Sequence, residues 1–291
     1  MLEPYERSVM KLGLSLRAFA ACIAIATICG ANARSVFANG EGAKPMHNGK
    51  VVPTIVLVHG ALTDASVWKD VILKLQLEGY QVLAPAMPLR GLHSDIAYLD
   101  SILETVQGPI VLVGHSYGGA VISGIKATSQ VKALVYVAAF QPDAGETAGG
   151  LNGKFPGSKL GPDTTIALSY PGGKDVYLKP AAFREVYAGD VPVDTAAAMA
   201  VAQRPIDGNA MSEPLQSPAT WHAIRSWALV ATKDNSIPTA ALRFMAARAH
   251  SKTVEVESSH AVPVAHPSAV VGLVIEAARS IHQRPFLDVA Q

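Results

Sequence analysis

The chain has 291 residues, of which 49% are hydrophobic and 16% are charged, and its formal net charge is +1. This length and apolar content suit one large α/β domain with a sizeable core. A near-neutral chain without a Lys/Arg-rich run is not expected to bind nucleic acid or an anionic membrane surface.

Residues 1–38 have the three parts of a secretory signal peptide. Its basic start is formed by three residues: Arg7, Lys11 and Arg17. Residues 18–31 form an apolar stretch that is short for a membrane-spanning helix. Small residues follow, and cleavage is expected after Ala33 or Ala38. We therefore predict a secreted or periplasmic protein that keeps no stable membrane anchor after cleavage.

Both cysteines of the chain, Cys22 and Cys29, lie inside this segment. The mature protein is therefore expected to have no disulfide and no cysteine that could act as a nucleophile or metal ligand. The next residues, 39–51, are polar and contain glycine, which predicts a loose linker.

Strand and helix patterns alternate through the first half of the core, residues 52–140. Apolar runs predict buried strands at 54–58, 81–84, 110–113 and 131–140. Helical spacing predicts helices at 67–77, 96–106 and 121–126. This alternation is typical of a doubly wound, mostly parallel sheet, in which ligands bind beyond the carboxyl ends of the strands.

The alternation stops at Gln141. Residues 141–221 are rich in glycine and proline and include candidate helices at 181–187 and 195–202, but no buried strand is evident. We predict a helical cap inserted after the strand that ends near Phe140. The second half of the core, residues 222–291, resumes the pattern with strands at 227–231 and 253–256 and helices at 239–249 and 269–281.

A candidate nucleophile lies directly after the buried run at residues 110–113. There the sequence reads Gly114-His115-Ser116-Tyr117-Gly118 and continues into a pattern of small residues at helical spacing. This is the G-x-S-x-G nucleophile elbow in its required context of strand, turn and helix. Such a turn holds Ser116 at a helix N-terminus, where free backbone N–H groups favour developing negative charge.

A serine hydroxyl needs a base, and the base needs an orienting carboxylate. Asp234 and His260 follow the next two predicted strands, so the chain order is Ser, Asp, His. Either residue alone would be read as an ordinary loop residue. Together, downstream of an elbow, they favour a catalytic triad of Ser116, Asp234 and His260.

Other histidines and acids are candidates for the roles of His260 and Asp234. Three histidines are interpreted as structural or cap-region residues: His59, His115 and His266. Asp64 and Asp143 are alternative acids, and Asp143 is the second choice because it follows an earlier strand.

The oxyanion of a tetrahedral intermediate needs two backbone donors. We predict the N–H groups of Tyr117, which follows the nucleophile, and of Ala61, in the loop after the first strand. No metal and no cofactor is expected, because the sequence lacks HExxH and GxxxxGK[ST] motifs and the elbow lacks G-x-G-x-x-G spacing.

With these residues placed, residues 52–281 resemble the α/β-hydrolase superfamily. The similarity is carried by the segments Val-His-Gly-Ala, Val-Gly-His-Ser-Tyr-Gly-Gly, Thr-Lys-Asp-Asn-Ser-Ile-Pro and Ser-Ser-His-Ala-Val-Pro. Within the superfamily the chain is similar to the plant methylesterase and hydroxynitrile lyase group and to bacterial carboxylesterases, including pyrethroid-hydrolysing ones. The resemblance implies an α/β-hydrolase fold and the same triad and oxyanion residues.

One difference from this group bears on the choice between ester hydrolysis and cyanohydrin cleavage. Hydroxynitrile lyases of the group carry a lysine directly after the catalytic histidine and lack the His-Gly pair in the first loop. Here Ala261 follows His260, and His59-Gly60 is present, which favours hydrolysis.

The sequence therefore predicts a serine esterase that forms an acyl-enzyme intermediate with a small-molecule ester. Three apolar cap residues either suggest a small, partly hydrophobic substrate or simply pack the lid: Phe155, Met199 and Trp221. Two alternatives stay open, namely a cofactor-free perhydrolase, haloperoxidase or lyase on the same triad, and a ligand-binding protein on a hydrolase scaffold.

Overall fold

The structure is a computed structural model that describes residues 46–47, 50–126 and 129–281. The predicted signal peptide and most of the predicted linker lie outside the described residues. The described end of the linker forms two short antiparallel strands, β1 (Met46–His47) and β2 (Lys50–Val51), where a loose segment was expected. Among the described residues, no helix is both long and apolar enough to cross a membrane.

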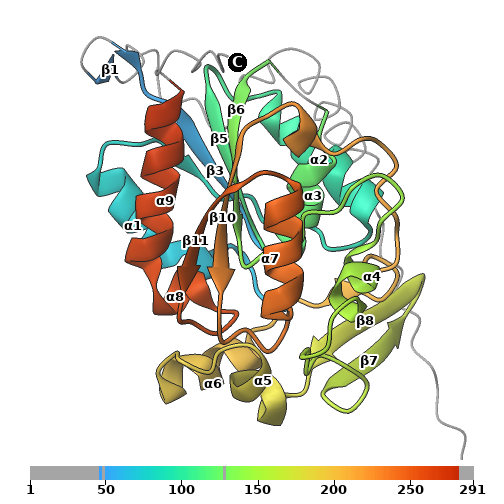
Figure 1. The fold of residues 1–291 in the computed structure, drawn as a ribbon. Helices are drawn as coiled ribbons and strands as arrows, with labels where there is room; N and C mark the ends of the chain where they lie inside the picture. Colours follow the sequence, from blue (N-terminus) through green and yellow to red (C-terminus); the bar gives the residue numbers. More distant parts are fainter. Residues whose placement is uncertain (1–45, 48–49, 127–128, 282–291) are drawn as a thin grey trace, which may run out of the picture. The chain divides into compact units, whose positions relative to one another are not determined.

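The core of the fold is a six-stranded sheet in the order β11-β10-β6-β5-β3-β4 (Figure 1). Its strands are β3 (Thr54–Val58), β4 (Val82–Leu83), β5 (Ile110–His115), β6 (Val131–Val137), β10 (Ser226–Ala231) and β11 (Lys252–Val256). Every pairing in it is parallel. The chain runs outward from β3 to β4 and then returns to β5, so the strand order reverses between β3 and β5. The predicted doubly wound parallel sheet is confirmed.

Alternate side chains of the strands enter two separate cores. Ile110 and Leu112 of β5 belong to one core, and Val111 and Val113 belong to the other. The first core is closed by α2 (Leu92–Leu103), α3 (Tyr117–Ser123) and α7 (Thr239–Arg248), and the second by α1 (Lys69–Leu77) and α9 (Pro267–Ser280) (Figure 1). Burying each such side chain contributes roughly 1.5–3 kcal/mol, which is why these strands are continuous apolar runs.

The segment between β6 and β10 forms the structure over the carboxyl ends of the strands (Figure 1). Its helices are α4 (Ala148–Gly153), α5 (Pro180–Val186) and α6 (Val193–Val201). It also contains an antiparallel sheet of β7 (Thr165–Tyr170), β8 (Gly173–Leu178) and β9 (Ile206–Asp207), which the sequence reading did not predict.

This small sheet was missed because β7 is largely exposed and so has no buried apolar run. The available signal was the turn between β7 and β8, which contains Pro171 and Gly172. Gly172 has φ +103°, the conformation required of the third residue of a type II turn that has proline second.

Helix α3 begins in close backbone contact with the end of β3 and with the segment that follows β6. A Cβ at Gly118 would lie 2.4 Å from the carbonyl oxygen of Val58, and one at Gly119 would lie 2.3 Å from that of Phe140. Only glycine lets the helix approach so closely. This approach sets the first turn of α3 against the loop that follows β3.

Replacing Gly118 by alanine tests this contact. We expect Gly118→Ala to lower the free energy of unfolding by about 1–3 kcal/mol, because the new methyl group must displace backbone atoms. Gly272 in α9 is the matched control, since a Cβ there meets no atom within 4 Å. Gly272→Ala is expected to raise stability by about 0.5–1 kcal/mol. Urea unfolding of the two variants measures both effects, and equal stabilities would contradict the packing argument.

Candidate active site

Ser116 lies at the sharp turn between β5 and α3. Its backbone has φ +54° and ψ −124°, a conformation that L-residues rarely adopt and that costs roughly 1–3 kcal/mol. The loop after β3 lies directly against it, because a Cβ at Gly60 would be 2.6 Å from Ser116 Cβ and 3.1 Å from its Oγ. The strained turn therefore places the hydroxyl at the reversal point of the sheet, beside the β3 loop.

Asp234 and His260 are joined in the interior by a hydrogen bond. His260 Nδ1 donates to Asp234 Oδ2 at 2.6 Å, and both side chains are almost completely buried. The other oxygen, Oδ1, accepts hydrogen bonds from the backbone amides of Ser236 at 2.7 Å and Ile237 at 2.9 Å. The backbone thus fixes one carboxylate oxygen. The other oxygen accepts the Nδ1 proton of His260, which leaves His260 Nε2 free to accept a proton.

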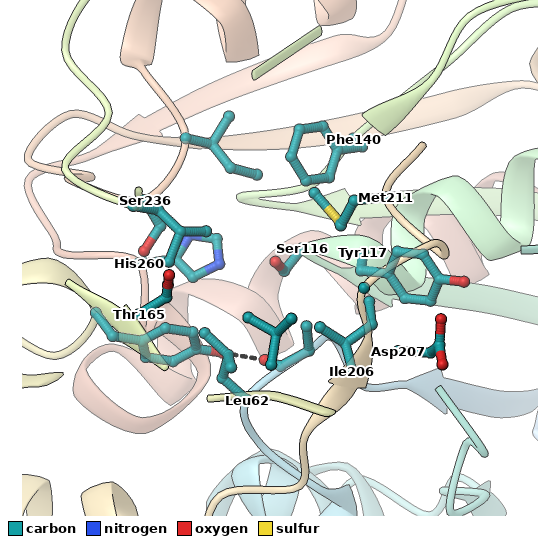
Figure 2. Close-up of a pocket in the computed structure, with 16 residues that line it drawn as sticks. Leu62, Ser116, Tyr117, Phe140, Thr165, Ile206, Asp207, Met211, Ser236 and His260 are labelled. Carbon is teal, nitrogen blue, oxygen red and sulfur yellow. Dashed lines mark hydrogen bonds between the residues drawn. The ribbon is translucent and has the colours of Figure 1, made fainter. Parts of the chain in front are cut away.

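Ser116 and His260 face the same pocket, and Figure 2 shows the hydroxyl and the imidazole ring at the same end of it. Among the described residues, no hydrogen bond joins Ser116 Oγ to His260. Such nucleophile–base contacts are commonly long in a ligand-free enzyme and shorten when the substrate is bound. The structure thus brings the three predicted triad residues to one site.

The two amides predicted for the oxyanion hole belong to residues that line the same pocket, Ala61 and Tyr117. Tyr117 is the first residue of α3, where helix N–H groups have no intrahelical acceptor. Within residues 50–126 and 129–281, neither the Ala61 nor the Tyr117 amide donates to another backbone or side-chain group.

The other two histidines of these loops have structural partners. His115 is fully buried, and its Nε2 donates to the carbonyl oxygen of His260 at 2.9 Å. His59 donates from Nδ1 to the Gly60 carbonyl at 2.8 Å and accepts from the Met87 amide at Nε2, at 2.9 Å. Burial lowers the pKa of both rings, and that of His115 is lowered further by the neighbouring His260. Both rings are held neutral as parts of the scaffold.

The remaining candidates lie elsewhere. Asp143 forms an ion pair with His222 at 3.0 Å near the surface, and Asp64 accepts from the Ser66 amide at the start of a short helical turn. His266 begins α9 and contacts Asp190 at 3.0 Å. None of these residues belongs to the described lining of the pocket.

The pocket has a volume of about 180 Å³, and its walls are mainly apolar. The cap contributes residues that the sequence reading did not single out: Leu160, Val176, Tyr187 and Met211. Phe155, Met199 and Trp221, which either mark a hydrophobic substrate or pack the lid, are not among the described residues that line the pocket. Phe155 and Trp221 pack into the first core instead, and Met199 packs among the cap helices.

Tyr187 is a cap residue that contacts His260. Its ring meets the His260 ring edge-on, with 4.7 Å between centroids, and its hydroxyl oxygen lies 3.5 Å from the Ala61 carbonyl oxygen. Nothing in the local sequence marks it, because the contact joins the end of α5 to two distant loops. Only its position at the end of the predicted cap helix 181–187 pointed to this region.

A parallel sheet with a serine elbow at its reversal point defines a class of α/β enzymes. The chain matches the alpha/beta hydrolase family over residues 55–273, and it therefore belongs to that family. The expectation drawn from the sequence resemblance is confirmed.

Two relatives match shorter parts of the sequence. A carbendazim-hydrolyzing esterase of Nocardioides sp. (strain SG-4G) is 34% identical over 106 residues, which cover 32% of this chain and 44% of the relative. A pyrethroid hydrolase of Sphingobium wenxiniae is 33% identical over 101 residues, covering 30% of this chain and 36% of the relative. The matched segments thus span less than half of the length of either relative.

Solved structures with this fold match at greater length. A pyrethroid hydrolase from Sphingobium faniae JZ-2 has a TM-score of 0.66 at 22% identity, covering 79% of this chain and 98% of the other. Tomato methylketone synthase I with 2-tridecanone has a TM-score of 0.67 at 19% identity, covering 80% and 100%. At these identities the likeness shows the shared fold.

The neutral buried histidines predict how stability depends on pH. Because folding lowers the pKa of His59 and His115 below the ordinary value of 6.5, the unfolded chain binds more protons than the folded chain just below that pH. The free energy of unfolding is therefore expected to fall on acidification from about pH 6.5, by up to about 1.4 kcal/mol per pH unit for each histidine. Urea unfolding between pH 7.5 and 5.5 measures this slope.

His115→Asn is expected to reduce the slope, whereas Ser101→Ala, which removes no titratable group from the exposed face of α2, is expected to leave it unchanged. A slope that His115→Asn does not alter would show that this ring is not held neutral by the fold.

Proposed function

We propose that this protein is a serine esterase in which Ser116, His260 and Asp234 form the catalytic triad. The proposal rests on one observation above the others, the buried hydrogen bond of 2.6 Å between His260 Nδ1 and Asp234 Oδ2 beside a serine elbow. A histidine oriented in this way has Nε2 available as a general base toward the serine hydroxyl. The esterase among the relatives supports the same reaction class.

In this mechanism Ser116 Oγ attacks the ester carbonyl carbon while His260 Nε2 takes the hydroxyl proton. The carbonyl oxygen becomes an oxyanion that the Ala61 and Tyr117 amides stabilise. Collapse of the intermediate breaks the bond to the alcohol oxygen, which receives the proton from His260, and leaves an acyl-serine. A water molecule, deprotonated by His260, then attacks the acyl carbon and releases the acid and the free serine.

The substrate we propose is a small, partly hydrophobic ester. Apolar side chains dominate the pocket, including Leu62 and Phe140 from the core and Leu160 from the cap. Such walls bind apolar groups by excluding water. The two relatives named for carbendazim and pyrethroid hydrolysis suggest aromatic carbamates and esters as the first compounds to assay.

We also propose that the protein is exported and that residues 1–38 are removed. The support is the basic start, apolar stretch and small residues of this segment. Expression of the full chain, followed by N-terminal sequencing of the extracellular or periplasmic protein, tests the proposal. A mature protein that begins at Met1 would contradict it.

The first test of catalysis is Ser116→Ala. We expect it to abolish fluorophosphonate labelling and to lower p-nitrophenyl ester turnover by about 10⁴-fold or more, because the nucleophile is lost. Ser101→Ala, on the exposed face of α2, is the control and is expected to match the wild type. Normal turnover by Ser116→Ala would overturn the proposal.

A second test uses the fixed orientation of the carboxylate. In Asp234→Asn the side-chain oxygen can keep the bonds from the Ser236 and Ile237 amides, so its NH₂ group faces His260. His260 Nδ1 must then accept a hydrogen bond, which places the ring proton on the nitrogen facing Ser116. We expect about 10⁴-fold lower kcat with an unchanged melting temperature.

Asp143→Asn is the comparison for this test, because Asp143 is the alternative acid and pairs with His222 instead. It is expected to keep wild-type kcat. The reverse pattern, with loss of activity only in Asp143→Asn, would reassign the acid of the triad.

A further inference from the structure

The last turn of cap helix α5 is bonded to both loops that carry the proposed acid and base. Three successive carbonyls there accept hydrogen bonds from outside the helix. Glu185 accepts from Asn235 Nδ2 at 2.9 Å and Val186 from Ser236 Oγ at 3.0 Å. Tyr187 accepts from the Ala261 amide at 2.9 Å.

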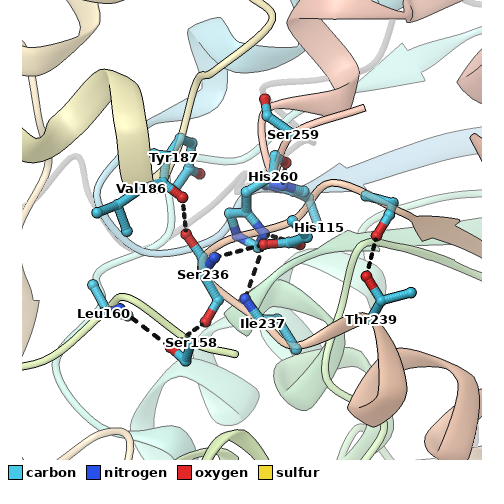
Figure 3. Close-up of polar contacts among 12 residues, drawn as sticks. His115, Ser158, Leu160, Val186, Tyr187, Ser236, Ile237, Thr239, Ser259 and His260 are labelled. Atoms are coloured by element: carbon cyan, nitrogen blue, oxygen red, sulfur yellow. Dashed lines mark hydrogen bonds and ion pairs between the residues drawn. The ribbon is translucent and has the colours of Figure 1, made fainter. Parts of the chain in front are cut away.

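These carbonyls are the groups that an α-helix leaves without intrahelical partners at its C-terminal end. Here the partners are the two residues that follow Asp234 and the one residue that follows His260. Figure 3 shows the Ser236 hydroxyl directed at the Val186 carbonyl, close to His260. The C-terminal end of one cap helix thus binds the acid loop and the histidine loop at once.

A carboxylate just beyond α5 adds a second attachment to the histidine loop. Asp190 accepts a hydrogen bond from Ser259 Oγ, and its other oxygen lies 3.0 Å from His266 Nε2. Ser259 directly precedes His260, and His266 follows it by six positions. The Asp190 carboxylate therefore holds the loop on both sides of the histidine.

We infer that Asn235, Ser236 and Asp190 are positioning residues, and that the segment 185–190 of the cap fixes the geometry of the Asp234–His260 pair. The inference rests on the proposed function, because it takes His260 as the base that activates Ser116. Neither loop is part of a helix or strand at the pair. A backbone bond of 3.0 Å from Lys233 to Ser258 joins the two loops just before the pair, and the residues that directly follow Asp234 and His260 are held by the cap. Without those contacts the carboxylate would orient the imidazole less well, and the serine would be less reactive.

The experiment compares two single variants, Asn235→Ala and Ser236→Ala, with the wild type. Among the described residues, Ser236 lines the pocket and Asn235 does not. If both variants lose rate to the same extent, the loss comes from positioning of the Asp234–His260 pair and not from contact with a ligand. The readout is the rate constant for labelling of Ser116 by a fluorophosphonate between pH 5 and pH 9, which needs no ester substrate.

We expect each variant to label about five- to tenfold more slowly at pH 7, the effect of about one lost hydrogen bond on an activated group. On p-nitrophenyl acetate, kcat should fall while KM stays within about twofold for Asn235→Ala. Ser236→Thr, which keeps a hydroxyl, should recover most of the rate.

Lys159→Met is the matched control, because Lys159 forms an ion pair with a side chain of α5. It removes the exposed ion pair of 2.9 Å between Lys159 and the Glu185 side chain but leaves the Glu185 carbonyl and its bond from Asn235 in place. Exposed pairs of this kind contribute little, so labelling should match the wild type. Asp190→Asn is the third variant, and it is expected to slow labelling in the same direction.

Wild-type labelling rates and pH profiles in Asn235→Ala, Ser236→Ala and Asp190→Asn would overturn the inference. A loss of rate that comes with a lower melting temperature and that Ser236→Thr does not recover would also overturn it by showing a purely structural role. A wild type that labels at Ser116 but turns over no ester overturns the proposed function alone, and the labelling rates still decide the positioning role. A wild type that does not label overturns both.

Discussion

The buried carboxylate of Asp234 is the constraint on which the arrangement of the site depends. An ionised group without exposed surface is costly unless its oxygens are hydrogen-bonded. Here two backbone amides and one imidazole meet that requirement, at distances of 2.6–2.9 Å. Hydrogen bonds to a charged group contribute about 1.5–3 kcal/mol each, so the loop after β10 has one favourable conformation. That conformation presents a single free oxygen to His260.

The parallel sheet explains why residues far apart in the chain meet at this carboxylate. β5, β10 and β11 all end at the same edge of the sheet, and the loops after them carry Ser116, Asp234 and His260 in that order. The reversal of strand order between β3 and β5 leaves room for a ligand where adjacent connections run to opposite faces. Ser116 and the β3 loop lie at that reversal, so the pocket and the proposed oxyanion donors arise from the same topological feature.

The sequence predicted those parts of the fold that depend on a short, continuous pattern of residues. Strands buried on both faces must be continuous apolar runs, so β3, β5, β6 and β10 could be recognised from their residues alone. The elbow was recognisable because Gly118 and Gly119 are required by close backbone contacts around a strained serine. Asp234 and His260 were recognisable by position, one after each of the next two predicted strands.

The parts that the sequence did not predict depend on contacts between distant segments. β7 is exposed, so its residues carry no burial pattern, and only the Pro171-Gly172 turn marks the hairpin. Tyr187 and Asp190 contact the histidine loop across about seventy residues of chain, and neither belongs to a motif. Apolar character alone could not place Phe155 and Trp221, because a large side chain in a cap packs equally well into the core beneath it.

The two ends of the cap are attached to the core in physically different ways. The segment 185–190 is bonded to the buried loops that hold Asp234 and His260, so displacing it would disturb the pair. The β7–β8 hairpin is held by Arg90, which pairs with Asp175 and lies over the Tyr170 ring, with 40% of the Arg90 side chain exposed. An exposed ion pair is weak and is screened by salt, whereas the bonds from Ser236 and Ala261 to the end of α5 lie among buried residues. The end of α5 therefore holds the loops of Asp234 and His260 more firmly than the Arg90 pair holds the hairpin.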